Sequence, residues 1–299
     1  MRNGFVWLAV FAGIVSGASI WLNKLAITGT EPVVFSFFKN IAVAMALIAI
    51  IIGIGKLGEI RKLNAKQWKS LILIGIMGGG IPFILFFYGL SMTSAFNAGF
   101  IQKTLFVFAS VFALVFLREK IGSKTVLAML GMAFGIILVS GTGFASFGFG
   151  DALIGIATVM WAAEIILSKK ALGEMSAQTV VFGRMLFGAI IMLAFLIAGG
   201  KIGGQALAGI ISGNGIFWLA VTAGTLLVYL LLLYNALKHE KVSVVTTILL
   251  VGVPITAILS ASGRGAPGII QGAGIFLILA GTAFVLYNSA LVQVPKVVQ

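Results

Sequence analysis

The sequence predicts an all-α membrane protein in which ten transmembrane helices form two inverted five-helix repeats. Of the 299 residues, 61% are hydrophobic and only 9% are charged, whereas soluble domains carry about 25% charged residues. The chain also divides into ten apolar stretches of about 20 residues, the length that crosses a bilayer as a helix. Finally, distinctive residues of the first half recur in the second half at a nearly constant spacing.

Each apolar stretch is taken as one span, and short loops separate the spans. The spans are predicted at residues 5–27, 33–55, 70–91, 95–116, 124–141, 150–171, 178–199, 215–237, 242–261 and 267–290. Because five spans per repeat is an odd number, the second repeat must lie upside down relative to the first. Inverted repeats are typical of transporters that work by alternating access.

The basic residues orient these spans. With the N-terminus in the cytoplasm, most of the 20 Lys and Arg residues fall in inner loops, whereas the outer loops hold only Lys201 and Arg264. Cytoplasmic loops carry the excess of basic residues in membrane proteins. We therefore expect a multi-pass protein of the cytoplasmic (inner) membrane with both termini inside. The net charge of +13 is interpreted as a topology signal, and no nucleic-acid partner is expected.

The residue types that most catalytic and metal sites need are scarce. The chain has no cysteine and a single histidine, His239, in a charged loop. Six of the seven acidic residues lie at expected span ends or in loops. No metal site, cofactor or catalytic constellation is therefore predicted, and an intramembrane enzyme is disfavoured. A scaffold or channel stays open as an alternative, although it leaves intramembrane charges unexplained.

The internal repeat can be followed in individual residues. At offsets of 145 and then 146, the first half matches the second as Lys24 with Lys169, Lys39 with Arg184, Tyr88 with Tyr234, and Arg118 with Arg264. A one-residue slip in a loop accounts for the change of offset. The two repeats are accordingly placed at residues 1–145 and 146–299.

The end of the fourth span and its second-half partner carry a family resemblance. The segment Ser110–Lys120 has Glu119 at its expected cytoplasmic end, and the partner segment contains Pro254. Together with the ten-span layout, this resembles the EamA-type transporters of the drug/metabolite transporter (DMT) superfamily. The family pattern of a helix proline and a terminal glutamate is divided here, because Phe108 and Gly265 stand at the other two positions. The resemblance implies a transporter with a central cavity lined by the first four helices of each half, the fifth and tenth being peripheral.

Two charges of opposite sign are expected at similar depth inside the bilayer. Glu164 lies in the inner half of the sixth span, and Arg184 lies about six residues into the seventh, at about 1.5 Å per residue. Buried charges are costly unless they are paired. The favoured interpretation is a structural ion pair. The alternative is that Glu164 titrates and couples transport to protons.

Two lysines are expected in the outer halves of spans two and four, without a matching acid. The position equivalent to Glu164 in the first half is Ser19. Lys39 is expected to extend its stem to the membrane surface, with cavity binding as the alternative. Lys103 lies deeper, about 12 Å along the span, and follows Gln102. Since an unpaired cation attracts carboxylates and phosphates, these two lysines and Gln102 are predicted to bind substrate, with Lys103 binding an anionic group.

The third span is interrupted near its middle by the segment Gly78–Pro82. Proline removes a backbone donor and clashes with the preceding turn, so a helix break is predicted at Gly79, Gly80 and Pro82. Freed carbonyls are tolerated only where they face protein or a cavity. The equivalent place in span eight is Ala223–Thr225, and paired interruptions indicate a midplane binding site. The alternative is a packing notch for a neighbouring helix.

Aromatic and polar residues are candidates for the cavity wall. Trp161, Glu164 and Ser168 share one face of span six. The predicted substrate-binding set therefore also includes Trp161, Tyr88 and Asn97. For Tyr88 and Tyr234, the favoured interpretation is the interfacial aromatic belt.

These features predict a secondary transporter that moves a small organic metabolite, amino-acid-like or organic-anion-like, by alternating access. No nucleotide-binding motif is present, so an ion or solute gradient would supply the energy. The alternative is a proton-coupled exporter of cationic drugs that uses Glu164, which the excess of intramembrane lysine over acid disfavours. The expected partners are the small-molecule substrate and the lipid bilayer. Proton or solute coupling, direction and oligomeric state stay open.

Overall fold

The secondary structure is helical throughout the part of the chain that the computed structural model describes, residues 4–140, 147–201, 203–261 and 268–292. Arg264, Gly265 and the predicted repeat boundary lie outside these residues. The helices are α1 (Gly4–Ala26), α2 (Pro32–Gly53), α3 (Leu57–Arg61), α4 (Ala65–Ile74), η1 (Gly75–Gly80), α5 (Ile81–Met92), α6 (Ala95–Lys103), α7 (Leu105–Phe116), α8 (Ser123–Ser140), α9 (Phe149–Ala171), α10 (Ala177–Ala198), α11 (Gly204–Ile211), α12 (Gly213–His239), α13 (Val242–Ile248), η3 (Leu249–Val251), α14 (Gly252–Ser260) and α15 (Ile269–Val292). The element η1 is a π-helix and η3 a 3₁₀-helix.

The ten predicted spans are confirmed. Within the described residues, nine helical stretches are long and apolar enough to cross a membrane, and a shorter apolar stretch, Ser123–Val139, lies in α8. The third span begins earlier than predicted, at Ala65, because Asn64 and Gln67 form a capping box ahead of the apolar run. The short helices α3 and α11 were not predicted. They have five and eight residues, too few to give a clear hydrophobic period.

Several spans begin at a side-chain cap, which satisfies backbone N–H groups that a helix start leaves free. Glu31 accepts a hydrogen bond from the backbone nitrogen of Val34 at 2.7 Å ahead of α2. Pro32 follows at the start of the helix, where its missing N–H group has no cost. Ser94 and Ser176 cap α6 and α10 in the same way. These polar residues fix where each apolar helix enters the bundle.

The helix contacts repeat between the two halves with their roles exchanged. The first span of each half packs on the third span of the other, so that α1 contacts α12 and α9 contacts α5. The second spans, α2 and α10, contact each other, as do the fifth spans, α8 and α15. This is the pattern of a pseudo-twofold axis between two inverted copies. The predicted arrangement as inverted five-helix repeats is therefore confirmed.

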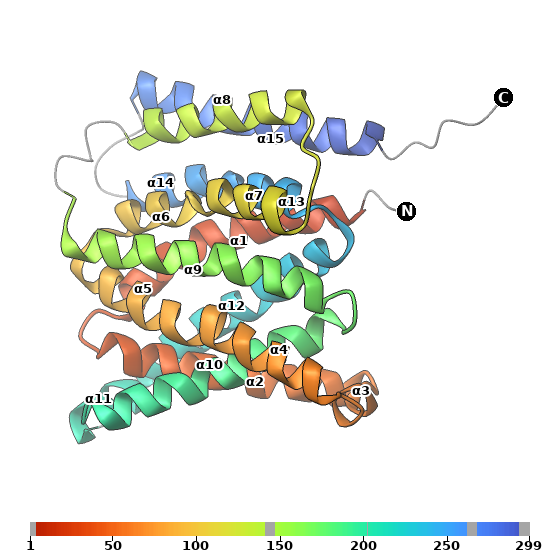
Figure 1. Ribbon diagram of the computed structural model, residues 1–299. Coiled ribbons are helices and arrows are strands. Elements are labelled where there is room, and N and C mark those ends of the chain that lie inside the picture. Colours follow the sequence, from red (N-terminus) through yellow and green to blue (C-terminus); the bar gives the residue numbers. More distant parts are fainter. Residues whose placement is uncertain (1–3, 141–146, 202, 262–267, 293–299) are drawn as a thin grey trace.

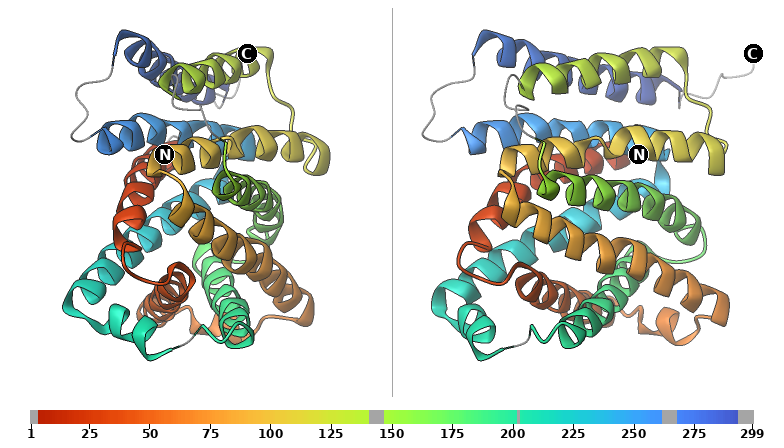
Figure 2. Two further views of the ribbon diagram at one scale, coloured as in Figure 1. Left: turned by 90° about the vertical axis from the view of Figure 1, so that its left-hand side faces the viewer. Right: turned by 60° about the vertical axis from the view of Figure 1, so that its left-hand side comes forward.

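The fifth spans form a separate layer at the edge of the bundle. Figure 1 shows α8 and α15 side by side at the top, with the other spans below, and Figure 2 shows the same layer from two further sides. The peripheral position that the resemblance implies for these spans is therefore confirmed. Figure 1 also shows that α1 begins and α15 ends at the side that carries α3. We call this the terminal end of the bundle, and the opposite side, with α11, the far end.

Glycines allow close contacts between the two halves. A Cβ atom on Gly79 would lie 2.0 Å from the carbonyl oxygen of Arg184, and one on Gly17 would lie 2.4 Å from that of Gly252. Helix backbones can approach this closely only where the side chain is absent, which favours association in lipid. Thr256 Oγ1 adds a hydrogen bond to the carbonyl oxygen of Gly17 at 2.8 Å. The triple glycine thus does provide the packing notch that was the alternative explanation for it.

The interruption in the third span is a π-helix, and it has no counterpart in span eight. The helix widens over Gly75–Gly80 without opening, and Pro82 lies in the first turn of α5. The paired interruption predicted at Ala223–Thr225 is wrong, because α12 is continuous from Gly213 to His239. A single glycine without a following proline leaves the helical hydrogen bonds in place.

A symmetric pair of breaks lies instead in spans four and nine. Helix α6 ends at Lys103 and α7 begins at Leu105, while η3 separates α13 from α14. Lys103 and Leu249, the first residue of η3, are related by the repeat offset of 146. In the second half, Pro254 accounts for the break, because its ring clashes with the carbonyl four residues earlier, inside η3. Lys103 stands at the first-half break, and its side chain lines the cavity described below.

Candidate substrate cavity

A cavity lies between the two halves and contains about 890 Å³ of space that no protein atom occupies, including the part open to solvent. Its wall is formed by the first four spans of each half, and none of its described lining residues comes from α8 or α15. Aromatic rings from α5, α9 and α12 make up much of the surface. The charged residues in the wall are Lys39, Lys103, Glu164 and Arg184. The cavity therefore lies where the resemblance implies.

Lys103 is the last residue of α6, and its side chain lines the cavity at the break before α7. The residue is 4% exposed, and its Nζ donates a hydrogen bond to Ser16 Oγ of α1 at 2.7 Å. An ammonium group has three donors, and among the described residues no acid forms an ion pair with it. The neighbouring Gln102 also lines the cavity, and its buried Oε1 has no hydrogen-bond partner in the described structure.

Lys39 does not extend to the membrane surface, so the favoured interpretation of this residue is wrong. It is only 1% exposed and lines the cavity. Its Nζ donates a hydrogen bond to Asn23 Oδ1 of α1 at 3.0 Å and lies 4.2 Å from the centroid of the Phe87 ring. A neutral acceptor and an aromatic face replace water as the environment of the ammonium group. The contacts with Asn23 and Phe87 therefore stabilise the ammonium group of Lys39 inside the bundle.

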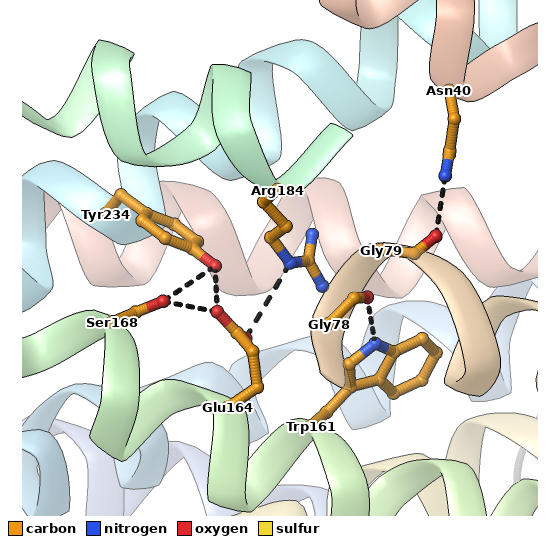
Figure 3. Close-up of polar contacts among 8 residues, drawn as sticks. All are labelled: Asn40, Gly78, Gly79, Trp161, Glu164, Ser168, Arg184 and Tyr234. Carbon is orange, nitrogen blue, oxygen red and sulfur yellow. Dashed lines mark hydrogen bonds and ion pairs between the residues drawn. The ribbon is translucent and has the colours of Figure 1, made fainter. Parts of the chain in front are cut away.

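Glu164 and Arg184 lie side by side in the wall (Figure 3), with Glu164 Oε2 3.7 Å from Arg184 Nε. Two hydroxyls hold the other carboxylate oxygen: Tyr234 donates to Oε1 at 2.5 Å, and Ser168 donates to the same atom. The Nη1 atom of Arg184 is buried without a hydrogen-bond partner among the described residues. Tyr234 is 1% exposed. Its interpretation as an interfacial residue is wrong, because α12 turns it toward the buried carboxylate of α9.

The π-helix exposes two carbonyl groups that side chains satisfy. Trp161 Nε1 donates to the carbonyl oxygen of Gly78 at 2.9 Å, and Asn40 Nδ2 donates to that of Gly79 at 2.8 Å (Figure 3). Trp161 also contacts the ring of Phe83 edge-on, with 5.6 Å between the centroids. A satisfied backbone and interlocked rings keep this part of the wall in one arrangement. Trp161 lines the cavity, as the sequence suggested.

Two of the predicted substrate-binding residues, Tyr88 and Asn97, do not line the cavity. At the far end, the hydroxyl of Tyr88 donates to Glu31 Oε1 at 3.1 Å and accepts a hydrogen bond from Lys201 Nζ. That hydrogen bond raises the pKa of Lys201. Asn97 lies in the first turn of α6, where its backbone nitrogen donates to Ser94 Oγ. Both residues were chosen for their polarity near span ends, where loops and caps also need polar groups, and the structure places neither of them in the cavity wall.

A polar face of α1 was missed as a whole. It consists of Ser16, Ser19 and Asn23, which line the cavity. Their spacing places them on one face of the helix. At the offset of 145, they are the equivalents of Trp161, Glu164 and Ser168. The same periodicity that indicated the face of span six was therefore available in span one.

Known proteins share this sequence pattern and this fold. Residues 4–141 and 148–287 each match the EamA-like transporter family. An uncharacterized transporter of Archaeoglobus fulgidus is 24% identical over 60% of this chain and 63% of its own length. Uncharacterized transporter YyaM of Bacillus subtilis is 27% identical over 64% of each chain. An uncharacterized transporter of Clostridium kluyveri is 24% identical over 67% of each. The chain thus spans only about 63 to 67% of the length of these relatives.

The fold recurs in a solved structure. A crystal structure of a protein superposes on 96% of this chain and 99% of its own, with a TM-score of 0.70 and 16% identity. At this identity the likeness concerns the fold alone. The family match covers both halves of the chain, and the described helices form the two-repeat bundle that such a match requires. The chain therefore belongs to the EamA-like transporter family of the drug/metabolite transporter superfamily, and it is a multi-pass membrane protein.

Proposed function

We propose that the protein is a secondary transporter of a small organic metabolite with a carboxylate group, amino-acid-like or organic-anion-like. The observation that carries this proposal is the pair of buried lysines in the cavity wall. Lys39 and Lys103 each donate to one neutral oxygen and have no acid as an ion-pair partner among the described residues. Burial of a charge without a counter-ion is costly. An anionic substrate in the cavity removes this cost.

The remaining wall suits a metabolite with an apolar or planar part. The rings of Phe83, Phe86 and Phe87 on α5 face the cavity, together with Trp161 and Tyr229 from the second half. Small-molecule sites combine such apolar surfaces with a few polar groups that orient the ligand. The charged groups would fix the carboxylate, while the rings would contact the body of the substrate.

Alternating access is supported by polar contacts between the halves at both ends of the bundle. At the terminal end, Glu119 Oε1 accepts from the backbone nitrogen of Val242 at 2.7 Å. At the far end, Lys201 Nζ lies 3.8 Å from Glu31 Oε1. A few hydrogen bonds and ion pairs at an end can be exchanged for water at small cost. We propose that each end opens in turn, with the terminal end in the cytoplasm and the protein in the cytoplasmic membrane.

A thermal-shift screen of the purified protein tests this proposal. Ligands that bind the folded state raise the unfolding temperature by mass action. We expect organic acids or amino acids to raise it and cationic dyes to leave it unchanged. An increase with cationic dyes alone would refute the anion proposal. A compound that stabilises the protein would then be tested for uptake into proteoliposomes.

A second candidate function is proton-coupled export of cationic drugs. The observation that favours it is Glu164, a buried acid in a cavity with aromatic walls. The cations Lys39, Lys103 and Arg184 in the same wall disfavour it, because they repel a cationic substrate. A pH-dependent efflux of a lipophilic cation that is lost in Glu164→Gln would establish this candidate in place of the first.

A further inference from the structure

The two halves of the cavity differ in one acid. In the second half, Arg184 has the carboxylate of Glu164 at 3.7 Å. In the first half, Lys39 stands at the position of Arg184, and Ser19 stands at the position of Glu164. Ser19 lines the cavity, and its buried Oγ has no hydrogen-bond partner among the described residues. The second repeat therefore has a carboxylate, that of Glu164, where the first repeat has only the hydroxyl of Ser19.

Lys103 is the second cation of the cavity that forms no ion pair with an acid of the described residues, and it contacts the same face of α1 as Lys39 does. Lys39 donates to Asn23 and Lys103 donates to Ser16, both on α1. These two acceptors are seven residues apart, or about 10 Å along the helix axis. Ser19 lies between them on the same face. The two ammonium groups thus mark the ends of a short polar track along α1.

We propose that the cavity binds a small dicarboxylate, with one carboxylate at Lys39, beside Ser19, and the other at Lys103. This inference rests on the proposed function and narrows its substrate class. Two buried cations are balanced by a ligand with two negative charges. At each end of the track, a charge-assisted hydrogen bond between the lysine nitrogen and a carboxylate oxygen is about 2.8 Å long. The length that remains suits succinate or glutarate, and the ring of Phe87 beside Lys39 provides an apolar contact for the methylene groups.

The acid of the second half does not compete for these lysines. Glu164 is held by the hydroxyls of Tyr234 and Ser168 and by Arg184. Its carboxylate therefore already has its partners. A phosphate monoester also carries two negative charges, but they lie on one group that cannot reach both ends of the track. A dicarboxylate and a phosphate monoester thus differ in the distance between their two negative charges, and only the dicarboxylate is expected to contact both lysines.

Isothermal titration of the purified full-length protein with matched acids tests the inference. The probes are succinate and glutarate, the monocarboxylates butyrate and pentanoate, and glycerol phosphate. We expect succinate or glutarate to bind at least about tenfold more tightly than the matched monocarboxylate. In Lys39→Met and in Lys103→Met, this preference should vanish while the monocarboxylate still binds. Lys24→Met is the control, because Lys24 lies in α1 next to Asn23 but donates to the carbonyl oxygen of Leu90 and is not among the described residues that line the cavity.

Ser19 offers a sharper test of the missing acid. Ser19→Glu introduces the carboxylate that the equivalent position of the second repeat holds. It should abolish the preference for the dicarboxylate and raise the unfolding temperature of the ligand-free protein, because Lys39 gains a partner. Ser19→Gln, which has nearly the same shape without the charge, should also fill the space of the carboxylate, but it should not raise the unfolding temperature of the ligand-free protein. These readouts separate loss of the site from loss of folding.

The outcomes distinguish this inference from the function on which it rests. Equal affinity for dicarboxylates and monocarboxylates would overturn the inference and leave the anion transporter standing. Tighter binding of glycerol phosphate than of either acid would do the same. Loss of the preference in Lys24→Met as well as in the cavity variants would also overturn it. If none of these anions binds while another organic acid or an amino acid raises the unfolding temperature in the thermal-shift screen, the inference fails and the proposed function stands. If no anion acts in either experiment, both fail.

Discussion

Lys39 and Arg184, the equivalent cations of the two repeats, lie against the same aromatic ring. Lys39 Nζ is 5.6 Å and Arg184 Cζ is 5.5 Å from the centroid of Phe83. The face of an aromatic ring attracts a cation, so Phe83 supports both charges at the centre of the cavity. The two cations differ in their partners, because Arg184 pairs with the carboxylate of Glu164 whereas Lys39 donates to the neutral side-chain amide of Asn23. This asymmetry within a symmetric scaffold is the feature that we connect to substrate binding.

The close contact of the π-helix with α10 predicts opposite effects for two glycine substitutions. Gly79→Ala should destabilise the protein by about 3 kcal/mol or prevent folding, because overpacked cores are strained and the new Cβ would lie 2.0 Å from the carbonyl oxygen of Arg184. Gly224→Ala is the matched control at the repeat-equivalent region of span eight. No atom lies within 4 Å of its Cβ, so it should stabilise α12 by up to about 1 kcal/mol. Thermal unfolding in detergent measures both, and equal effects would contradict the contact.

The hydrogen bond from Tyr234 to Glu164 predicts that Tyr234→Phe lowers the free energy of unfolding. Hydrogen bonds to charged groups contribute about 2 kcal/mol, and this one joins two buried groups at 2.5 Å. Tyr229→Phe is the control, because Tyr229 also lines the cavity, whereas the hydroxyls that bond to Glu164 are those of Tyr234 and Ser168. Chemical unfolding of the two variants side by side provides the measurement. A loss of stability of the same size in both would show that the bond to Glu164 has no special role.

The ion pair predicts strong coupling between Glu164 and Arg184. Glu164→Gln leaves the guanidinium buried without a counter-charge, and removal of one partner of a buried pair costs about 3 kcal/mol. The double variant Glu164→Gln with Arg184→Met removes both charges and should recover more than half of that loss. A double-mutant cycle on unfolding free energies measures the coupling. Additive effects would mean that the two charges are energetically independent.

The proposed orientation predicts which engineered cysteines are accessible from outside the cell. The chain has no cysteine, so single substitutions can be labelled without background. Thr28→Cys, in the exposed turn after α1, should react with a membrane-impermeant maleimide in intact cells. Lys62→Cys, in the exposed turn after α3, should react only after the membrane is permeabilised. The reverse pattern would place the terminal end outside.

The span pattern was predictable because it depends on average hydropathy, which the lipid imposes on every residue of a span. Inversion followed from the odd number of spans per repeat, and the contacts of α1 with α12 and of α9 with α5 confirm it. The helices α3 and α11 were not predictable in this way, because they are too short for an average hydropathy to identify them. The break in spans four and nine also escaped prediction, although Pro254 offered a signal in the second half.

The site was less predictable because a helix face depends on rotation as well as depth. Lys39 was assigned to the surface from its depth alone, yet Asn23 and Phe87 hold it inside. Tyr234 was assigned to the interface for the same reason, and its hydroxyl bonds to Glu164 instead. Lys103 was assigned correctly to the wall because it lies too deep for its stem to reach water. Periodicity along span one would have found the polar face of α1.

Anion uptake by proteoliposomes that contain wild-type protein or Lys103→Ala tests the proposed function most directly. The labelled anion is the one that most raises the unfolding temperature of the wild type. We predict that Lys103→Ala lowers the rate of uptake at least about tenfold, equivalent to about 1.4 kcal/mol, because the carboxylate loses a buried cation. Lys24→Ala, which removes a lysine outside the cavity, should keep most of the rate. Undiminished uptake in Lys103→Ala would contradict the assignment of this cavity as an anion site.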